Sequence, residues 1–168
     1  MRAVIAIAFL CLVAACAPAP SPSPSSVAPA PSAAGSASAS AAPAAWLPPW
    51  ADATTPVEVA TRTALPFCGV EQGAGPGITI NAEVRSCFLG GYQDDTGAEF
   101  ASIQSTMEGD PIATIWRTIP GGGVEMLYDA TQDKFGAKVW RRTTCRVLVS
   151  DQQEVFVADQ CDEGVAIP

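Results

Sequence analysis

The sequence IATIWRTIPGGGVEMLYDA, residues 112–130, carries the clearest structural signal in this chain. Two runs rich in β-branched, aliphatic and aromatic residues, 112–119 and 124–130, flank the segment Pro-Gly-Gly-Gly at 120–123. Proline and glycine supply the backbone geometry of a reversal, so the pattern is typical of a β-hairpin. We therefore expect this hairpin to lie within an antiparallel sheet.

The segments around this hairpin extend the predicted sheet. We expect further strands at 100–108, 139–149 and 154–158, and the alternating segment 57–63 is interpreted as an edge strand. The last two long strands form a second hairpin around 151–153. If this hairpin is centred near Gln153, Val149 faces Val157 and Cys145 lies opposite Cys161.

The segment 81–92 predicts the main helix. Asn81 is a good N-cap, and Glu83 suits the positive end of the helix dipole. Four residues fall on one face at helical spacing, and we expect this face to point inward: Val84, Cys87, Phe88 and Tyr92. The predicted fold is α+β, with one helix packed on an antiparallel sheet of four to five strands.

The first 50 residues differ sharply in composition from the rest of the chain. They contain one charged residue, Arg2, whereas residues 51–168 hold all 17 acidic residues and have a formal charge of −9. A hydrophobic stretch at 3–15 is too short to span a bilayer but suits a signal peptide. We therefore expect a signal peptide at 1–15 and a folded domain at 51–168.

The end of this hydrophobic stretch, LVAAC at 12–16, resembles the lipobox of bacterial lipoproteins. The resemblance implies cleavage before Cys16 and attachment of a diacylglycerol, with acyl chains such as palmitate, to the sulfur. Two buried chains hold a protein stably at a membrane. The chain would then be anchored to the outer face of the bacterial cell membrane. The alternative is an ordinary secretory signal cleaved after Ala17 or Ala19.

Residues 16–50 are expected to be the lipidated cysteine followed by a disordered linker. Residues 17–45 are almost entirely Ala, Pro and Ser, which leaves no apolar surface to offset the entropy of ordering. This richness in Ala and Pro resembles that of secreted proteins from high-GC actinobacteria. The closing segment WLPPW, 46–50, either docks on the domain or forms a small exposed patch.

The cysteines of the domain predict two disulfides. Cys11 leaves with the signal peptide and Cys16 is lipidated, so four remain. An even number in an exported domain implies disulfides, with three connectivities open. The helix and hairpin positions favour sequential pairing, which joins the residues as follows: Cys68 with Cys87, and Cys145 with Cys161.

Composition also bears on chemistry. The chain has no histidine, which excludes Ser-His-Asp triads and HExxH zinc sites, and its acidic character argues against nucleic-acid binding. The string DTGA at 95–98 matches part of an aspartic protease motif, but its second copy is missing and a turn explains it better. The sequence shows no catalytic set, cofactor motif or metal site.

The candidate ligand patch is the one basic cluster of the acidic domain. Trp140, Arg142 and Arg146 share one strand face by a period of two, together with Thr144. An exposed tryptophan beside arginines suits a sugar or an anionic polymer. The alternative is a sheet face on which arginine covers tryptophan and pairs with acids of neighbouring strands.

We expect a non-catalytic module at the cell envelope that binds a protein, a glycan or a small ligand. Two alternatives stay open. One is a hydrolase that uses a pair of carboxylates. The other is an envelope inhibitor or chaperone that uses a hairpin loop, such as 119–124, as a wedge.

Overall fold

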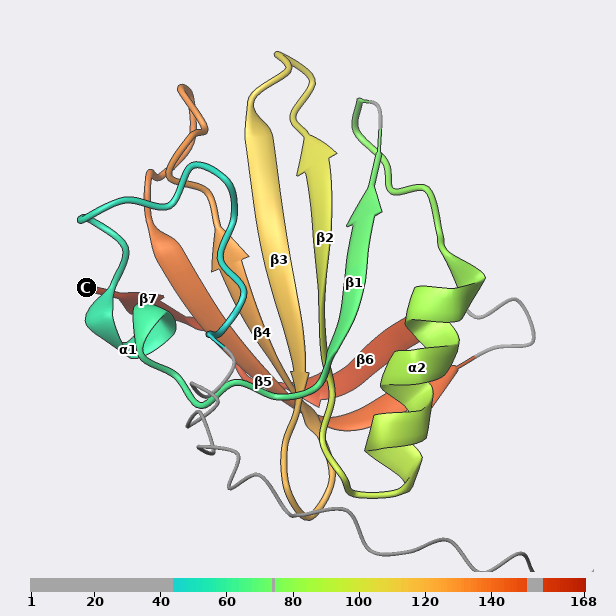
Figure 1. Cartoon of the computed structure of the whole chain (residues 1–168). Helices are drawn as coiled ribbons and strands as arrows, with labels where there is room; N and C mark the ends of the chain where they lie inside the picture. The colour runs from blue at the N-terminus through green and yellow to red at the C-terminus, as the bar shows by residue number, and fades with distance from the viewer. Residues whose placement is uncertain (1–43, 74, 151–155) are drawn as a thin grey trace, which may run out of the picture. The chain divides into compact units, whose positions relative to one another are not determined.

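The computed structural model describes residues 44–73, 75–150 and 156–168. The predicted signal peptide, Cys16 and most of the predicted linker lie outside the described residues, as does the predicted turn at 151–153. The described residues form a curved sheet with two helices (Figure 1). None of their helices is long and apolar enough to cross a bilayer.

The sheet has seven strands, which is more than the four to five expected. Six follow one another in space in the order β1-β2-β3-β4-β5-β6, and the short β7 pairs with β5. Their bounds are β1 Phe67–Gln72, β2 Glu99–Ser105, β3 Pro111–Thr118, β4 Val124–Asp129, β5 Trp140–Ser150, β6 Phe156–Cys161 and β7 Val165–Ile167. The α+β class holds, but the sheet forms most of the domain.

Both predicted hairpins are confirmed. β3 and β4 pair antiparallel, and Thr118 lies opposite Val124 across the turn. The three glycines of this turn have φ angles of 83°, 101° and 102°, which other residues rarely adopt. In the second hairpin Cys145 pairs with Cys161 and Val149 with Val157, the register expected from the sequence.

The first strand was not expected, and it makes the sheet mixed rather than purely antiparallel. β1 runs parallel to β2. Parallel neighbours need a long crossover, and α2, Ala82–Gln93, supplies it here. The glycine-rich segment around β1 has no clear hydrophobic alternation, so no strand was predicted there.

The predicted edge strand at 57–63 is wrong. Residues Val57–Ala60 form the short helix α1, in which the fully buried Val59 packs into the core. The Thr61 backbone N–H and hydroxyl both donate to the Val57 carbonyl oxygen. These bonds close a helical turn. The Thr61 N–H and the Val57 carbonyl are thereby used within the segment, whereas in a strand they would pair with a neighbouring strand.

Helix α2 begins as predicted, and the Asn81 side chain accepts hydrogen bonds from the backbone N–H groups of Glu83 and Val84. Val84 and Phe88 are buried, but Cys87 is exposed, which corrects the expected inward direction. Its partner Cys68 lies on β1, the edge strand of the sheet, so this disulfide is formed at the margin of the core.

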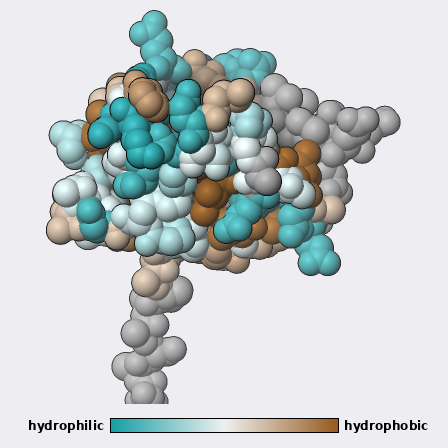
Figure 2. Space-filling view, turned by 90° about the horizontal axis from the view of Figure 1, so that it is seen from above, coloured by the Kyte–Doolittle hydropathy of each residue, from teal (hydrophilic) through white to brown (hydrophobic). Residues whose placement is uncertain are grey.

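The core has two parts, one on each face of the sheet. Val84 and Phe88 of α2 pack with Phe100 and Val124. The other cluster joins Val59 of α1 with a set of strand residues, Ile115, Leu127, Trp140 and Ile167. Figure 1 accordingly shows α2 beside β1, and α1 near β7 at the other end. From above, hydrophobic and hydrophilic residues are interspersed (Figure 2).

The segment 46–50 docks on the domain, which was one of the two alternatives for it. Trp46 and Leu47 pack against the second core cluster, and Trp46 stacks on Phe67 with ring centroids 5.7 Å apart. The Trp50 Nε1–H donates to the Asp129 carboxylate at 2.7 Å. The folded body therefore includes residues that composition alone had assigned to the linker.

Candidate functional site

The predicted ligand patch does not form one exposed surface. Trp140 is only 3% exposed and belongs to the core beneath α1. Arg142 lies 3.0 Å from both Glu58 and Glu125, so its charge is already compensated. Arg146 is exposed. The ion pairs of Arg142 agree with one part of the alternative interpretation, in which arginine pairs with acids of neighbouring strands.

Most other arginines of the domain also have structural partners. Glu99, 1% exposed, accepts hydrogen bonds from Arg62 at 2.6 and 3.2 Å and from Arg117 at 2.8 Å. Arg62 also donates to the carbonyl oxygens of Val59 and Trp46. These bonds fasten the segment before β1 to the sheet. We call the set Arg62, Glu99 and Arg117 the Glu99 clamp.

A second buried ion pair joins α2 to β1. The Arg85 guanidinium donates to both carboxylate oxygens of Glu71, at 2.5 and 2.7 Å, and lies over the Phe100 ring. Glu71 also accepts from the Asn81 backbone N–H at the start of the helix. This arrangement explains why Arg85 is buried on a helix face that the sequence assigned to apolar residues.

One hollow on the sheet combines aromatic, hydroxyl and basic side chains. Its volume is about 370 Å³, within the size range of small-molecule sites. We call it the sheet hollow, and six residues line it: Thr114 and Trp116 of β3, Met126 and Tyr128 of β4, and Arg141 and Thr143 of β5.

Strand register brings these six side chains to one face. Thr114 lies opposite Tyr128, and Trp116 lies opposite Met126. Tyr128 and Met126 in turn lie opposite residues of β5, Arg141 and Thr143. Directly opposed residues of an antiparallel pair point to the same side of the sheet, so the lining follows from the pairing.

The hollow exists because α2 covers only part of this face. A helix of 12 residues is about 18 Å long. It packs on Phe100 and Val124, near one end of β2 and β4. The face beyond the helix stays open, and there the half-buried Trp116, Met126 and Tyr128 line the floor.

Two aromatic side chains of the sheet hollow have defined environments. The Trp116 ring stacks on Phe100 with centroids 5.7 Å apart, and its Nε1–H donates to the Ser102 hydroxyl at 3.3 Å. Partial burial raises the pKa of Tyr128 above its ordinary value of 10.0, and the nearby charges of Asp133 and Asp129 raise it further. The Tyr128 hydroxyl therefore stays protonated at neutral pH.

Arg141 supplies the positive charge of the sheet hollow. It is exposed, and its Nη2 donates to the Gly164 carbonyl oxygen at 3.3 Å. Among the described arginines, Arg141 and Arg146 form no ion pair, whereas four others do: Arg62, Arg85, Arg117 and Arg142. Arg141 therefore has the charge and the free donors to bind an anion.

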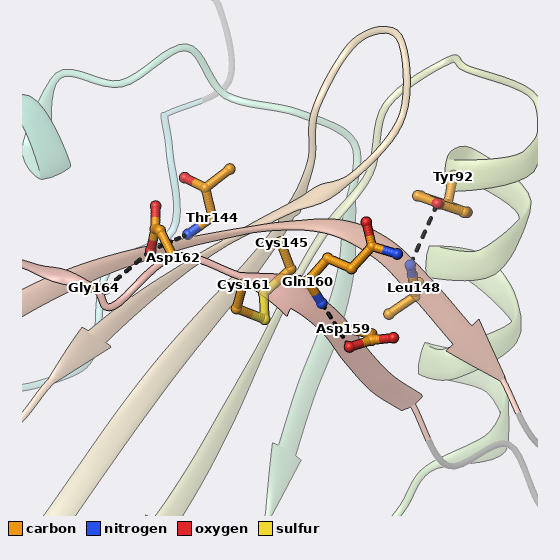
Figure 3. Close-up of a disulfide and its surroundings, with 9 residues drawn as sticks. All are labelled: Tyr92, Thr144, Cys145, Leu148, Asp159, Gln160, Cys161, Asp162 and Gly164. Atoms are coloured by element: carbon orange, nitrogen blue, oxygen red, sulfur yellow. Dashed lines mark hydrogen bonds between the residues drawn. A yellow bond between two sulfur atoms is a disulfide. The ribbon is translucent and has the colours of Figure 1, made fainter.

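A second hollow, of about 500 Å³, is lined in part by Cys161. Cys161 forms a disulfide with Cys145, which Figure 3 shows with its surroundings. Arg146 also lines this hollow, together with Asp162. The Asp162 carboxylate accepts from the Thr144 and Gly164 backbone N–H groups at 3.1 and 3.0 Å. The Asp162 carboxylate thus holds the turn after β6 against β5. We call this second hollow the disulfide hollow.

Sequence reasoning missed the sheet hollow, although its strands were predicted. Thr114 and Trp116 alternate along the first strand of the hairpin at 112–130, and Met126 and Tyr128 alternate along the second. This spacing is typical of side chains that share one face of a sheet. Which face α2 leaves open depends on how far the helix reaches across the sheet, and local patterns do not contain this information. Within the described ranges, no cluster of three or more potential metal ligands occurs.

The chain matches no protein-family model, and neither a curated protein nor a solved structure is significantly similar to it.

Proposed function

We propose that this chain is a lipid-anchored, extracytoplasmic binding module whose sheet hollow holds a ligand. The two disulfides fit an oxidising compartment outside the cytoplasm. The lipobox ending at Cys16 supports an anchor on the outer face of the cell membrane, and the Ala-, Pro- and Ser-rich segment after it supports a tether.

The observation that carries the binding role is the lining of the sheet hollow. Aromatic, thioether and hydroxyl groups surround an open volume with one arginine at its edge, a mixture typical of small-molecule sites. Its floor is held firmly, because Trp116 is fixed by both Phe100 and Ser102. A preformed floor reduces the entropic cost of binding.

The carboxylates of the domain argue for binding over carboxylate-based hydrolysis. Such a hydrolase needs two carboxyl groups that face each other across a cleft. The buried acids of the described residues instead accept from structural donors: Glu71 from Arg85, Glu99 from Arg62 and Arg117, Asp110 from Lys134, and Asp129 from Trp50. The six residues that line the sheet hollow include no acid.

An NMR titration tests the binding role with phenol as a neutral aromatic probe. We expect shifts to concentrate on the backbone amides of Thr114, Met126 and Tyr128. The variant Thr114→Trp places a large side chain in the hollow and should abolish them. The matched variant Thr144→Trp alters the disulfide hollow and should leave them intact. Shifts that are absent, or that spread evenly over the surface, would contradict the proposal.

Anchoring is tested separately by cell fractionation. The unaltered chain should sediment with membranes, and Cys16→Ser should release it into the soluble extracytoplasmic fraction. Cys11→Ser is the control, because that residue precedes the predicted cleavage site and its replacement should not change the distribution. If mass spectrometry shows that residues 1–15 have been removed from Cys16→Ser and it still distributes like the unaltered chain, the anchor is refuted.

A further inference from the structure

We propose that the ligand of the sheet hollow is a small organic anion with an apolar body, of the aromatic or aliphatic carboxylate class. This inference rests on the proposed binding function and specifies its ligand. The observation behind it is that an unpaired arginine stands directly across from the tyrosine of an otherwise uncharged, largely apolar lining.

The apolar body of the ligand is indicated by the floor. Trp116, Met126 and Tyr128 contribute a ring, a thioether and a second ring to one continuous surface of two neighbouring strands. Apolar groups gain free energy when they leave water for such a surface. Methionine also adapts its shape to irregular ligands, which suits a flat ring or a short chain.

The negative charge of the ligand is indicated by Arg141. The domain is strongly acidic, and four of its six described arginines form ion pairs with acidic side chains. Arg141 instead projects from β5 with a single hydrogen bond to a carbonyl oxygen. A guanidinium with free donors binds a carboxylate through two parallel hydrogen bonds. No carboxylate lines the sheet hollow to compete for it.

Tyr128 completes the anion site. It lies directly opposite Arg141 in the β4–β5 pairing, so both side chains point to the same face. Its hydroxyl can donate to an anion, and Thr114 and Thr143 add hydroxyl groups on either side. Asp133 and Asp129, whose charges raise the pKa of Tyr128, are not among the residues that line the hollow. The disulfide hollow offers a poorer anion site, because Asp162 lies there with Arg146.

Photolabelling of the full chain tests the ligand class. The probes are 4-benzoylbenzoate, an aromatic carboxylate, and benzophenone, its neutral counterpart. Both insert into nearby C–H bonds on illumination, and peptide mass spectrometry locates the label. We expect 4-benzoylbenzoate to label the peptide containing Met126 and Tyr128 more strongly than benzophenone does, and decanoate to compete with it.

Variants of the two unpaired arginines give a matched comparison. Arg141→Gln should weaken labelling by 4-benzoylbenzoate about tenfold, which corresponds to the loss of one charge-assisted interaction. Arg141→Lys keeps the charge and should retain most of the labelling, and Arg146→Gln should have no effect. High salt should weaken labelling of the unaltered chain but change Arg141→Gln little. Thermal unfolding confirms that each variant is folded.

The outcomes separate the two proposals. If both probes label the hollow equally and Arg141→Gln has no effect, the hollow binds ligands but the anion assignment is wrong. If neither probe labels the hollow and phenol causes no shifts there, the binding function itself fails. Labelling that is strongest beside the disulfide hollow and lost in Arg146→Gln would also overturn the assignment.

Discussion

Replacing Glu99 by glutamine should destabilise the domain more than any exchange of an exposed acid. The Glu99 side chain is 1% exposed and that of Arg62 is 4% exposed. Glutamine keeps the shape but removes the charge, and it turns an N–H₂ group toward arginine donors. Arg62 then stays buried without a negative partner: the single amide oxygen is shared with Arg117, and the other acceptors of Arg62 are the carbonyl oxygens of Val59 and Trp46.

The expected magnitude follows from this geometry. Breaking a buried ion pair by removing one partner costs about 3–5 kcal/mol, because the other charge is left uncompensated. Arg117 retains Glu125 at 2.8 Å and the Thr63 carbonyl oxygen at 2.7 Å, so the cost falls mainly on Arg62. For a domain of this size about 4 °C of melting temperature corresponds to 1 kcal/mol, which gives a decrease of about 12–20 °C.

Circular dichroism during heating and urea unfolding measure this change. The control is Glu58→Gln, which removes a partner of Arg142 where the side chains are 34% and 45% exposed. Exposed pairs contribute about 1 kcal/mol or less, so this control should unfold near the unaltered chain. If Glu99→Gln unfolds within about 3 °C of Glu58→Gln, the clamp does not hold the domain as argued.

Three further changes test separate parts of the fold. Asn81→Ala removes the N-cap of α2 and should lower the free energy of unfolding by about 1 kcal/mol, measured in urea; an unchanged value would contradict the cap. Trp50→Phe leaves the buried Asp129 without its indole donor and should cost about 2 kcal/mol, whereas no loss would mean that 46–50 does not dock. In Tyr92→Phe the remaining tyrosine, Tyr128, should ionise above its ordinary pKa of 10.0 in the absorbance at 295 nm. Because its folded-state pKa is raised, the contribution of Tyr128 to stability is complete below the unfolded pKa and is lost as pH rises through the folded value; an ordinary pKa would refute its partial burial.

Local patterns predicted the parts of this fold that depend on neighbours in sequence. The Pro-Gly-Gly-Gly turn determines the β3–β4 hairpin, and Asn81 caps α2 in the way its side chain favours. The register of β5 and β6 followed from a turn of fixed centre, and it brought Cys145 opposite Cys161. These features involve residues close along the chain, so the sequence specifies them directly.

The features that were missed depend on distant contacts. β1 is a strand because α2 returns the chain beside it in parallel, not because its six residues alternate. The segment 57–63 alternates but forms a helical turn, since Val59 fills the core. Trp140 was a candidate member of a ligand patch, yet it packs in a core cluster with Val59 of α1, and the docked Trp46 packs against this cluster. In each case tertiary packing overrode the local pattern.

The most direct test of the anchored binding module is the intact mass of the protein isolated from the cell envelope, followed by mapping of its first peptide. The account predicts a chain that begins at Cys16, carries a diacylglyceryl group on that sulfur, and has lost four hydrogens through its two disulfides. A chain with an unmodified Cys16, or one that begins after it, would contradict the account.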